Sequence, residues 1–229
     1  MGTISLEHSD RLYWLGRYTE RVFTTLKSLE KLYDKTIDSN SEVYEGYLKC
    51  LGIPNTYSNS SDFFRDIIFN KDNINSVAYS LGRAYDNGIV LREEISTEAL
   101  SFLQMAMDHL DKVKDGDGQK LRLSLLPLRD ILYGFWGCLW DYVLDEELAA
   151  IIGCGKYAER LDLYLRLKYP KSDVEREFSR MCTYLGKIPK NTPYRYNTNQ
   201  LSVLVEYMGG EENHETSQAV FALNRLFAR

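Results

Sequence analysis

Apolar residues recur along most of this chain at the spacing of α-helices. The first stripe alternates steps of three and four residues over several turns: Leu12, Leu15, Thr19, Val22, Leu26, Leu29 and Tyr33. This period places all of these side chains on one face of a helix, which predicts a long helix against a core. Ser5 precedes the stripe and is the predicted N-cap.

Boundary residues predict where several later helices begin and end. Ser61, Ser96 and Asp145 each stand before an apolar stripe as a predicted N-cap, and Ser172-x-x-Glu175 has the spacing of a capping box. Residues 121–125 alternate in polarity as a strand does, but Pro127 follows, so we expect an irregular entry to a helix that reaches Val143. The pattern as a whole predicts an all-α fold, a single domain over residues 1–229 with about eight helices.

The composition is that of an ordinary globular protein. Of the 229 residues, 44% are hydrophobic and 27% are charged, which excludes a disordered chain. The formal net charge is −5, whereas a general nucleic-acid binder is usually basic, so no nucleic-acid partner is expected.

The cysteines and the apolar segments bear on the compartment. The four cysteines form no C-x-x-C pair and the three histidines stand far apart, so we expect reduced thiols and neither a metal site nor another cofactor. The most apolar segments, 132–140 and 148–155, are far shorter than the roughly 18 residues of a membrane span. Residues 1–25 carry six charged side chains and no apolar stretch, so a signal peptide is not expected there. These features predict a cytoplasmic protein without a membrane partner.

One motif occurs twice in the chain. Leu15-Gly-Arg-Tyr-Thr-Glu-Arg21 recurs as Cys154-Gly-Lys-Tyr-Ala-Glu-Arg160, and the same offset of 139 residues pairs Val22 with Leu161 and Leu26 with Leu165. A match that continues at helical spacing indicates two related long helices. We expect them to pack together with pseudo-twofold symmetry.

The spacing within the motif brings charges together on one side of each helix. Arg17, Glu20 and Arg21 stand at i, i+3 and i+4, and Gly16 lies one turn before Glu20. A helical glycine costs about 1 kcal/mol relative to alanine, a cost that makes sense where a backbone or a ligand approaches closely. Two interpretations stay open. The glutamates and arginines pair across a helix interface and fix its register, or they line a polar pocket that holds a carboxylate or phosphate.

The chain resembles a known family at three points. Arg11-Leu-Tyr-Trp-Leu-Gly-Arg-Tyr-Thr-Glu-Arg21 is similar to the opening motif of the bacterial alpha-E domain family, which is all-helical. Its middle motif is echoed by Asp86-Asn87, by Arg92-Glu93-Glu94-Ile95-Ser96 and by Glu98, and its later motif by Gly155-Lys-Tyr-Ala-Glu-Arg160. The resemblance covers about residues 5–168. Tyr85 and Ile89 stand where the family often has arginines, and Ala149 where it usually has a tryptophan.

The resemblance implies a context in amide or peptide-bond metabolism. Alpha-E proteins tend to be encoded beside, or fused to, ATP-grasp ligases and transglutaminase-like proteins, which are therefore the expected partners. The first hypothesis is an accessory subunit of an ATP-grasp-type ligase. The second is an enzyme in its own right, and the third is a purely structural helical module.

The enzyme hypothesis assigns a role to each candidate residue. Glu20 or Glu159 would be the general base, and an anionic small molecule would be the substrate. The predicted substrate-binding residues are Arg17, Tyr18, Arg21, Asn87, Arg92, Glu93, Lys156, Tyr157 and Arg160. The structural hypothesis instead predicts that these charges pair with one another and leave no cavity.

Overall fold

The structure is a computed structural model that describes residues 5–38, 43–114, 121–189, 194–210 and 215–227. Within these ranges it contains eleven helices and no strand, which confirms the all-α prediction. The helices are α1 (Leu6–Asp38), α2 (Val43–Leu51), α3 (Ser60–Phe69), α4 (Val77–Val90), α5 (Arg92–Ile95), α6 (Thr97–Val113), α7 (Leu121–Tyr142), α8 (Glu146–Arg166), α9 (Lys171–Leu185), α10 (Thr198–Gly209) and α11 (Thr216–Asn224).

The predicted count of about eight helices is too low. Part of the difference lies at Leu91, where φ −97° and ψ 16° end α4 and let the four-residue α5 begin. The expectation of two long helices is also incomplete, because α7 has 22 residues beside the 33 of α1 and the 21 of α8. Pro127 lies inside α7 rather than before it. Burial of Leu125, Leu128 and Leu132 on one face outweighs the backbone hydrogen bond that the proline lacks.

Three of the predicted N-caps are confirmed. The Ser5 Oγ accepts from the His8 amide at 3.2 Å, Ser96 accepts from the Ala99 amide, and Asp145 accepts from two amides of the first turn of α8. The caps of α3 and α9 lie elsewhere: Asn59 caps α3, and Pro170 occupies the N-cap position of α9 without a side-chain bond. Both helices therefore begin before the serines that the sequence indicated.

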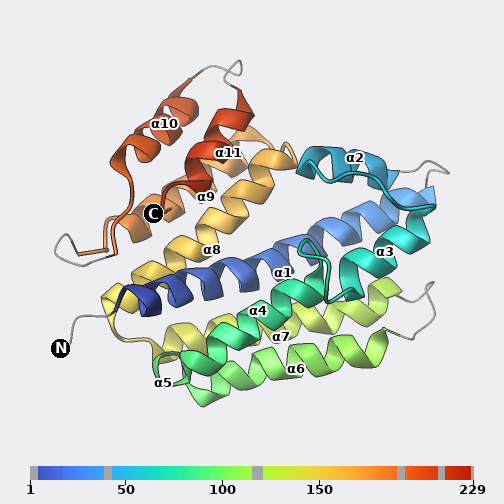
Figure 1. Ribbon diagram of the computed structural model, residues 1–229, viewed down its shortest axis with the longest axis horizontal. Helices are drawn as coiled ribbons and strands as arrows, with labels where there is room; N and C mark the ends of the chain where they lie inside the picture. Colours follow the sequence, from blue (N-terminus) through green and yellow to red (C-terminus); the bar gives the residue numbers. More distant parts are fainter. Residues whose placement is uncertain (1–4, 39–42, 115–120, 190–193, 211–214, 228–229) are drawn as a thin grey trace.

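Helix α1 is the central element of the fold (Figure 1). It lies between α4, α6 and α7 on one side and α8 to α11 on the other, and it packs closely against α4 and α8. Its predicted stripe is buried, including Leu12, Leu15, Val22, Leu26 and Leu29. None of the helices in the described ranges is long and apolar enough to cross a membrane.

Candidate functional site

The two motif helices cross at their glycines. A Cβ atom built on Gly16 would clash with the backbone of Ile152 and Lys156, and one built on Gly155 would clash with the backbone of Tyr13 and Arg17. Ile152 and Lys156 stand 139 residues after Tyr13 and Arg17, so each glycine contacts the equivalent backbone of the other helix. The close approach explains both glycines, and the reciprocal contacts are those expected of pseudo-twofold packing.

The motif carboxylates bind guanidinium groups of the opposite helix. Arg17 Nε lies 2.6 Å from Glu159 Oε2, and Arg21 Nε lies 2.5 Å from Glu159 Oε1. In the other direction, Arg160 Nε lies 2.7 Å from Glu20 Oε1. The pairs Glu20–Arg160 and Glu159–Arg21 are thus equivalent in the two repeats.

Burial strengthens the interactions between the charges of this cluster. Glu159 is 1% exposed. Burial alone would raise the pKa of Glu159, but the guanidinium groups of Arg17 and Arg21 outweigh it and lower the pKa to about 2. Burial lowers the pKa of Arg17 and the Glu159 carboxylate raises it, with a net rise. Glu159 is therefore an ionised partner in the folded protein and a very weak base.

Glu20 differs from its counterpart in one respect. Its Oε1 accepts from Arg160 and, at 2.8 Å, from the Thr24 hydroxyl, while its buried Oε2 has no hydrogen-bond partner within the described part of the chain. Arg160 also reaches Glu177 Oε2 at 3.3 Å. The two halves of the crossing are therefore not chemically identical.

Glu177 is a member of the cluster that the motif comparison missed. It lies on α9, is 1% exposed and pairs with Arg160, Arg176 and Arg180. Its signal in the sequence is its position in the stripe of Val174, Met181 and Leu185, where a charged residue on a buried face needs a partner.

A second polar chain extends from Arg17 to α11. Both terminal nitrogens of Arg17 donate to Asn224 Oδ1 at 3.3 Å, and Asn224 Nδ2 donates to Asp162 Oδ1 at 2.8 Å. Arg166 in turn binds Asp162 at 2.8 Å. Neither Asp162 nor Asn224 belongs to a motif that the sequence analysis recognised.

Lys156 takes the place of Arg17 in the second repeat and lies among aromatic rings. Its Nζ is 3.8 Å from the centroid of the Trp136 ring and 5.7 Å from that of Trp140. Burial lowers the pKa of Lys156 to about 8, against an opposing effect of Glu20. The neighbouring Tyr157 ring stacks on Tyr184 with centroids 5.5 Å apart.

Tyr18 lies beside the cluster rather than within it. The Arg21 guanidinium is 5.5 Å from the centroid of its ring, and the Arg160 guanidinium stands at the same distance from the ring of Tyr157. The two motif tyrosines are therefore packed against the motif arginines in equivalent ways.

The remaining candidates lie outside this crossing. Asn87 belongs to α4, while Arg92 and Glu93 belong to the short α5 and form an exposed pair with each other at 3.2 Å. Within the ranges that the structure describes, none of the three lies at hydrogen-bond or ion-pair distance from the motif charges. In the same ranges, no three His, Cys, Asp or Glu side chains are grouped so that they could hold a metal ion.

Comparison with known proteins gives one match. Residues 8–218 match the Alpha-E family, described as a predicted alpha-helical domain with a conserved ER motif. Searches of curated proteins and of solved structures gave no significant match. Three Glu-Arg dipeptides lie in the matched range, and two of them, Glu20-Arg21 and Glu159-Arg160, form the crossing of α1 and α8. The match covers nearly the whole chain, and this protein belongs to the Alpha-E family.

Proposed function

We propose that this Alpha-E protein is a non-catalytic helical subunit that works with an ATP-grasp-type amide or peptide ligase in the bacterial cytoplasm. The non-catalytic role rests on one observation: the charged side chains of the two motifs pair with one another. The ligase, and a transglutaminase-like protein as a further partner, come from the context that the alpha-E resemblance implies.

The geometry supports a structural role for the Glu-Arg motifs. Each guanidinium group of the crossing is bound to a carboxylate: Arg17 and Arg21 to Glu159, and Arg160 to Glu20 and Glu177. A ligand anion would have to displace a buried carboxylate, which would leave that charge unpaired at a cost of several kcal/mol. The same ion pairs fix the register of α1 and α8 at the contact of Gly16 and Gly155.

A stand-alone enzyme is the second candidate, and one observation favours it. Among the described residues, the buried Oε2 of Glu20 has no hydrogen-bond partner. The pKa of Lys156 is lowered by burial to about 8, against an opposing effect of the Glu20 carboxylate. A carboxylate near an amine whose pKa is about 8 can serve as an acid–base pair. An anionic substrate would then bind next to Glu20 rather than at Glu159.

Direct binding to a purified ATP-grasp ligase encoded beside this protein tests the first candidate. We expect isothermal titration calorimetry to show a stoichiometric complex with a micromolar or lower dissociation constant. We also expect the ligase's rate of amide formation to change when the complex forms. A ligase that shows no heat of binding and an unchanged rate at saturating concentrations would refute the proposal.

The variant Glu20→Gln separates the two candidates. If the motif is structural, Glu20→Gln lowers the melting temperature while the folded fraction still binds the ligase and changes its rate. If Glu20 is a catalytic base, turnover of the substrate is lost although the melting temperature is retained. Glu206→Gln is the matched control, since the Glu206 side chain is exposed on α10 and lies outside the crossing.

A further inference from the structure

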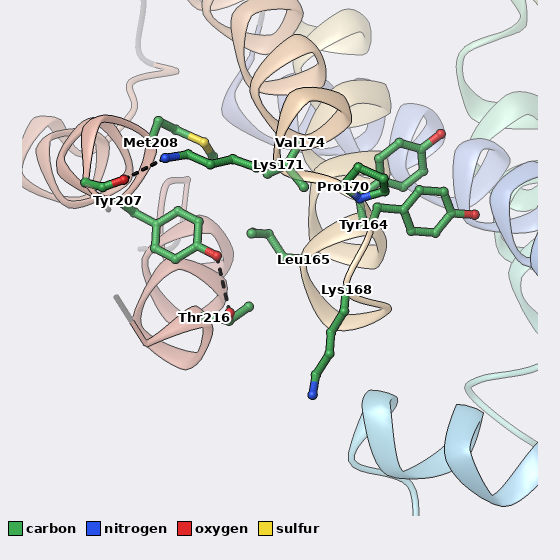
Figure 2. A pocket seen from close by; sticks show the side chains of 11 residues that line it. Tyr164, Leu165, Lys168, Pro170, Lys171, Val174, Tyr207, Met208 and Thr216 are labelled. Carbon is green, nitrogen blue, oxygen red and sulfur yellow. Dashed lines mark hydrogen bonds between the residues drawn. The ribbon is translucent and has the colours of Figure 1, made fainter. Parts of the chain in front are cut away.

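Two clefts flank the turn that joins α8 to α9. One, of about 420 Å³, lies between this corner and the α10–α11 hairpin (Figure 2). The other, of about 470 Å³, lies between the corner, α1 and α2. Lys168, Tyr169 and Pro170 line both clefts, so the turn forms a ridge with a hollow on each side.

The lining of both clefts is basic. Of the described residues that line them, Lys31, Lys35, Lys168 and Lys171 are charged, and none is Asp or Glu. This is unusual in a chain with a formal net charge of −5. The N-terminus of the 15-residue helix α9 lies at the same corner, and its N-cap Pro170 offers no side-chain acceptor. Asp173 in the first turn of α9 is paired with Arg176 at 2.6 Å.

Lys168 occupies a position that favours glycine. Its φ is +53°, and the amide of Tyr169 bonds the Tyr164 carbonyl while that of Lys168 bonds the Leu165 carbonyl, which is the pattern of a Schellman turn. A lysine there costs more than a glycine, and its ammonium has no ion-pair partner in the part of the chain that is described. The charge at this position thus comes with a conformational cost.

The ridge carries a stacked pair of aromatic rings. The rings of Tyr164 and Tyr169 stack with centroids 4.0 Å apart and an interplanar angle of 5°. The Lys31 ammonium lies 5.1 Å from the centroid of the Tyr169 ring on the α1 side. A ligand therefore meets a preformed surface, which lowers the ordering cost of binding.

The polar groups of the α10–α11 side are partly engaged. Lys171 reaches across the cleft and donates to the Gly210 carbonyl at 2.6 Å, as Figure 2 shows, and it lies 3.9 Å from Glu175. Its ammonium has three hydrogens, so it can still donate to a ligand. The Tyr207 hydroxyl bonds the Thr216 hydroxyl at 3.2 Å and closes this side of the cleft.

We propose that this ridge and its two clefts bind an acidic peptide segment in an extended conformation. Carboxylates spaced along such a chain would meet Lys31 on one side of the ridge and Lys168 and Lys171 on the other. The peptide backbone and the aliphatic parts of its side chains would lie on Tyr169 and Pro170. The charge complementarity selects an anion, and the two-sided apolar ridge selects a chain over a single compact anion.

The test is fluorescence anisotropy with a labelled oligoglutamate peptide, and an oligoglutamine peptide of the same length as the uncharged control. We expect the oligoglutamate alone to bind, and to weaken as ionic strength rises from about 0.05 to about 0.5 M. Lys31→Gln and Lys168→Gln should each weaken binding about threefold, and the double variant about tenfold. Lys112→Gln on the exposed surface of α6 removes the same charge elsewhere and should change nothing.

Three results would overturn the proposal. Binding that the double variant retains would place the peptide elsewhere, and equal binding of oligoglutamine would remove the charge argument. Displacement of the peptide by inorganic phosphate at constant ionic strength would show a phosphate site instead. The inference is independent of the proposed ligase partnership, because no ligase enters the measurement, and circular dichroism of each variant checks that the fold is retained.

Discussion

Alanine at the crossing glycines should destabilise this protein, whereas alanine at another helical glycine should stabilise it. In Gly16→Ala and Gly155→Ala the new methyl group meets backbone atoms of the opposite helix, which cannot rotate away. The two helices must then separate. In Gly137→Ala, on an exposed face of α7, the methyl group finds no atom within 4 Å.

The magnitudes follow from two opposing effects. Alanine gains about 1 kcal/mol over glycine in a helix interior. Overpacking costs about 1–3 kcal/mol and more where backbone is the obstacle, so Gly16→Ala should lose about 3 kcal/mol net. For a chain of this length that is a fall in melting temperature of roughly 6–12 °C, against a rise of roughly 2–4 °C for Gly137→Ala.

Thermal unfolding followed by circular dichroism measures both shifts, with urea unfolding as a second estimate of the free energy. The double variant Gly16→Ala/Gly155→Ala should lose less than the sum of the two single variants. The reason is that one methyl group already separates the helices that the other would push apart. If Gly16→Ala and Gly137→Ala shift the melting temperature in the same direction, the close crossing of α1 and α8 is wrong.

Three further predictions concern charged side chains. The pKa of Glu159 is lowered to about 2, so its contribution of about 3 kcal/mol is complete above pH ~4.5 and lost as pH falls toward 2; Glu159→Gln should flatten that acid limb in pH-dependent urea unfolding. Lys168→Gly should stabilise the protein by about 1 kcal/mol, because Lys168 has a positive φ. Lys27→Gly inside α1 should destabilise it by about as much, and thermal melts compare the two variants. The pKa of Lys156 is lowered to about 8, so above that pH the folded protein gives up a proton that the unfolded chain keeps. The free energy of unfolding of the wild type should then rise relative to that of Lys156→Met, by at most about 1.4 kcal/mol per pH unit in parallel urea titrations.

The fold class and the central contact could be predicted from the sequence. The stripe from Leu12 to Tyr33 gave the buried face of α1, and the offset of 139 residues paired the two Glu-Arg motifs that meet at the crossing. Both signals are local or repeated in the chain. The break at Leu91 could not be predicted, because Leu81, Ala84, Gly88, Leu91 and Ile95 keep helical spacing across it although the backbone does not continue.

The outer members of the charge cluster could not be predicted from the motif. Glu177 and Asn224 come from α9 and α11, and nothing in their spacing relates them to Arg160 or Arg17. They are brought in by the packing of α9 and α11 against α8, which depends on tertiary contacts rather than on any repeat. Asn87, Arg92 and Glu93, which the resemblance implied as site residues, lie on α4 and α5 outside the crossing, and their role in binding stays a prediction.

The pairing of glycines with buried charges has a physical logic at this crossing. Two helices that touch at glycines approach so closely that a shift along either axis would bring a bulkier residue into the contact. Such a shift would take Glu159 away from Arg17 and Arg21 and leave a buried carboxylate unpaired, at a cost of about 3–5 kcal/mol. The correct register is the one in which both Glu-Arg motifs are satisfied together. The ER motif therefore has a structural role at this crossing that requires no reaction at the glutamates. This role does not account for two buried oxygens, Glu20 Oε2 and Thr19 Oγ1, which have no hydrogen-bond partner among the described residues.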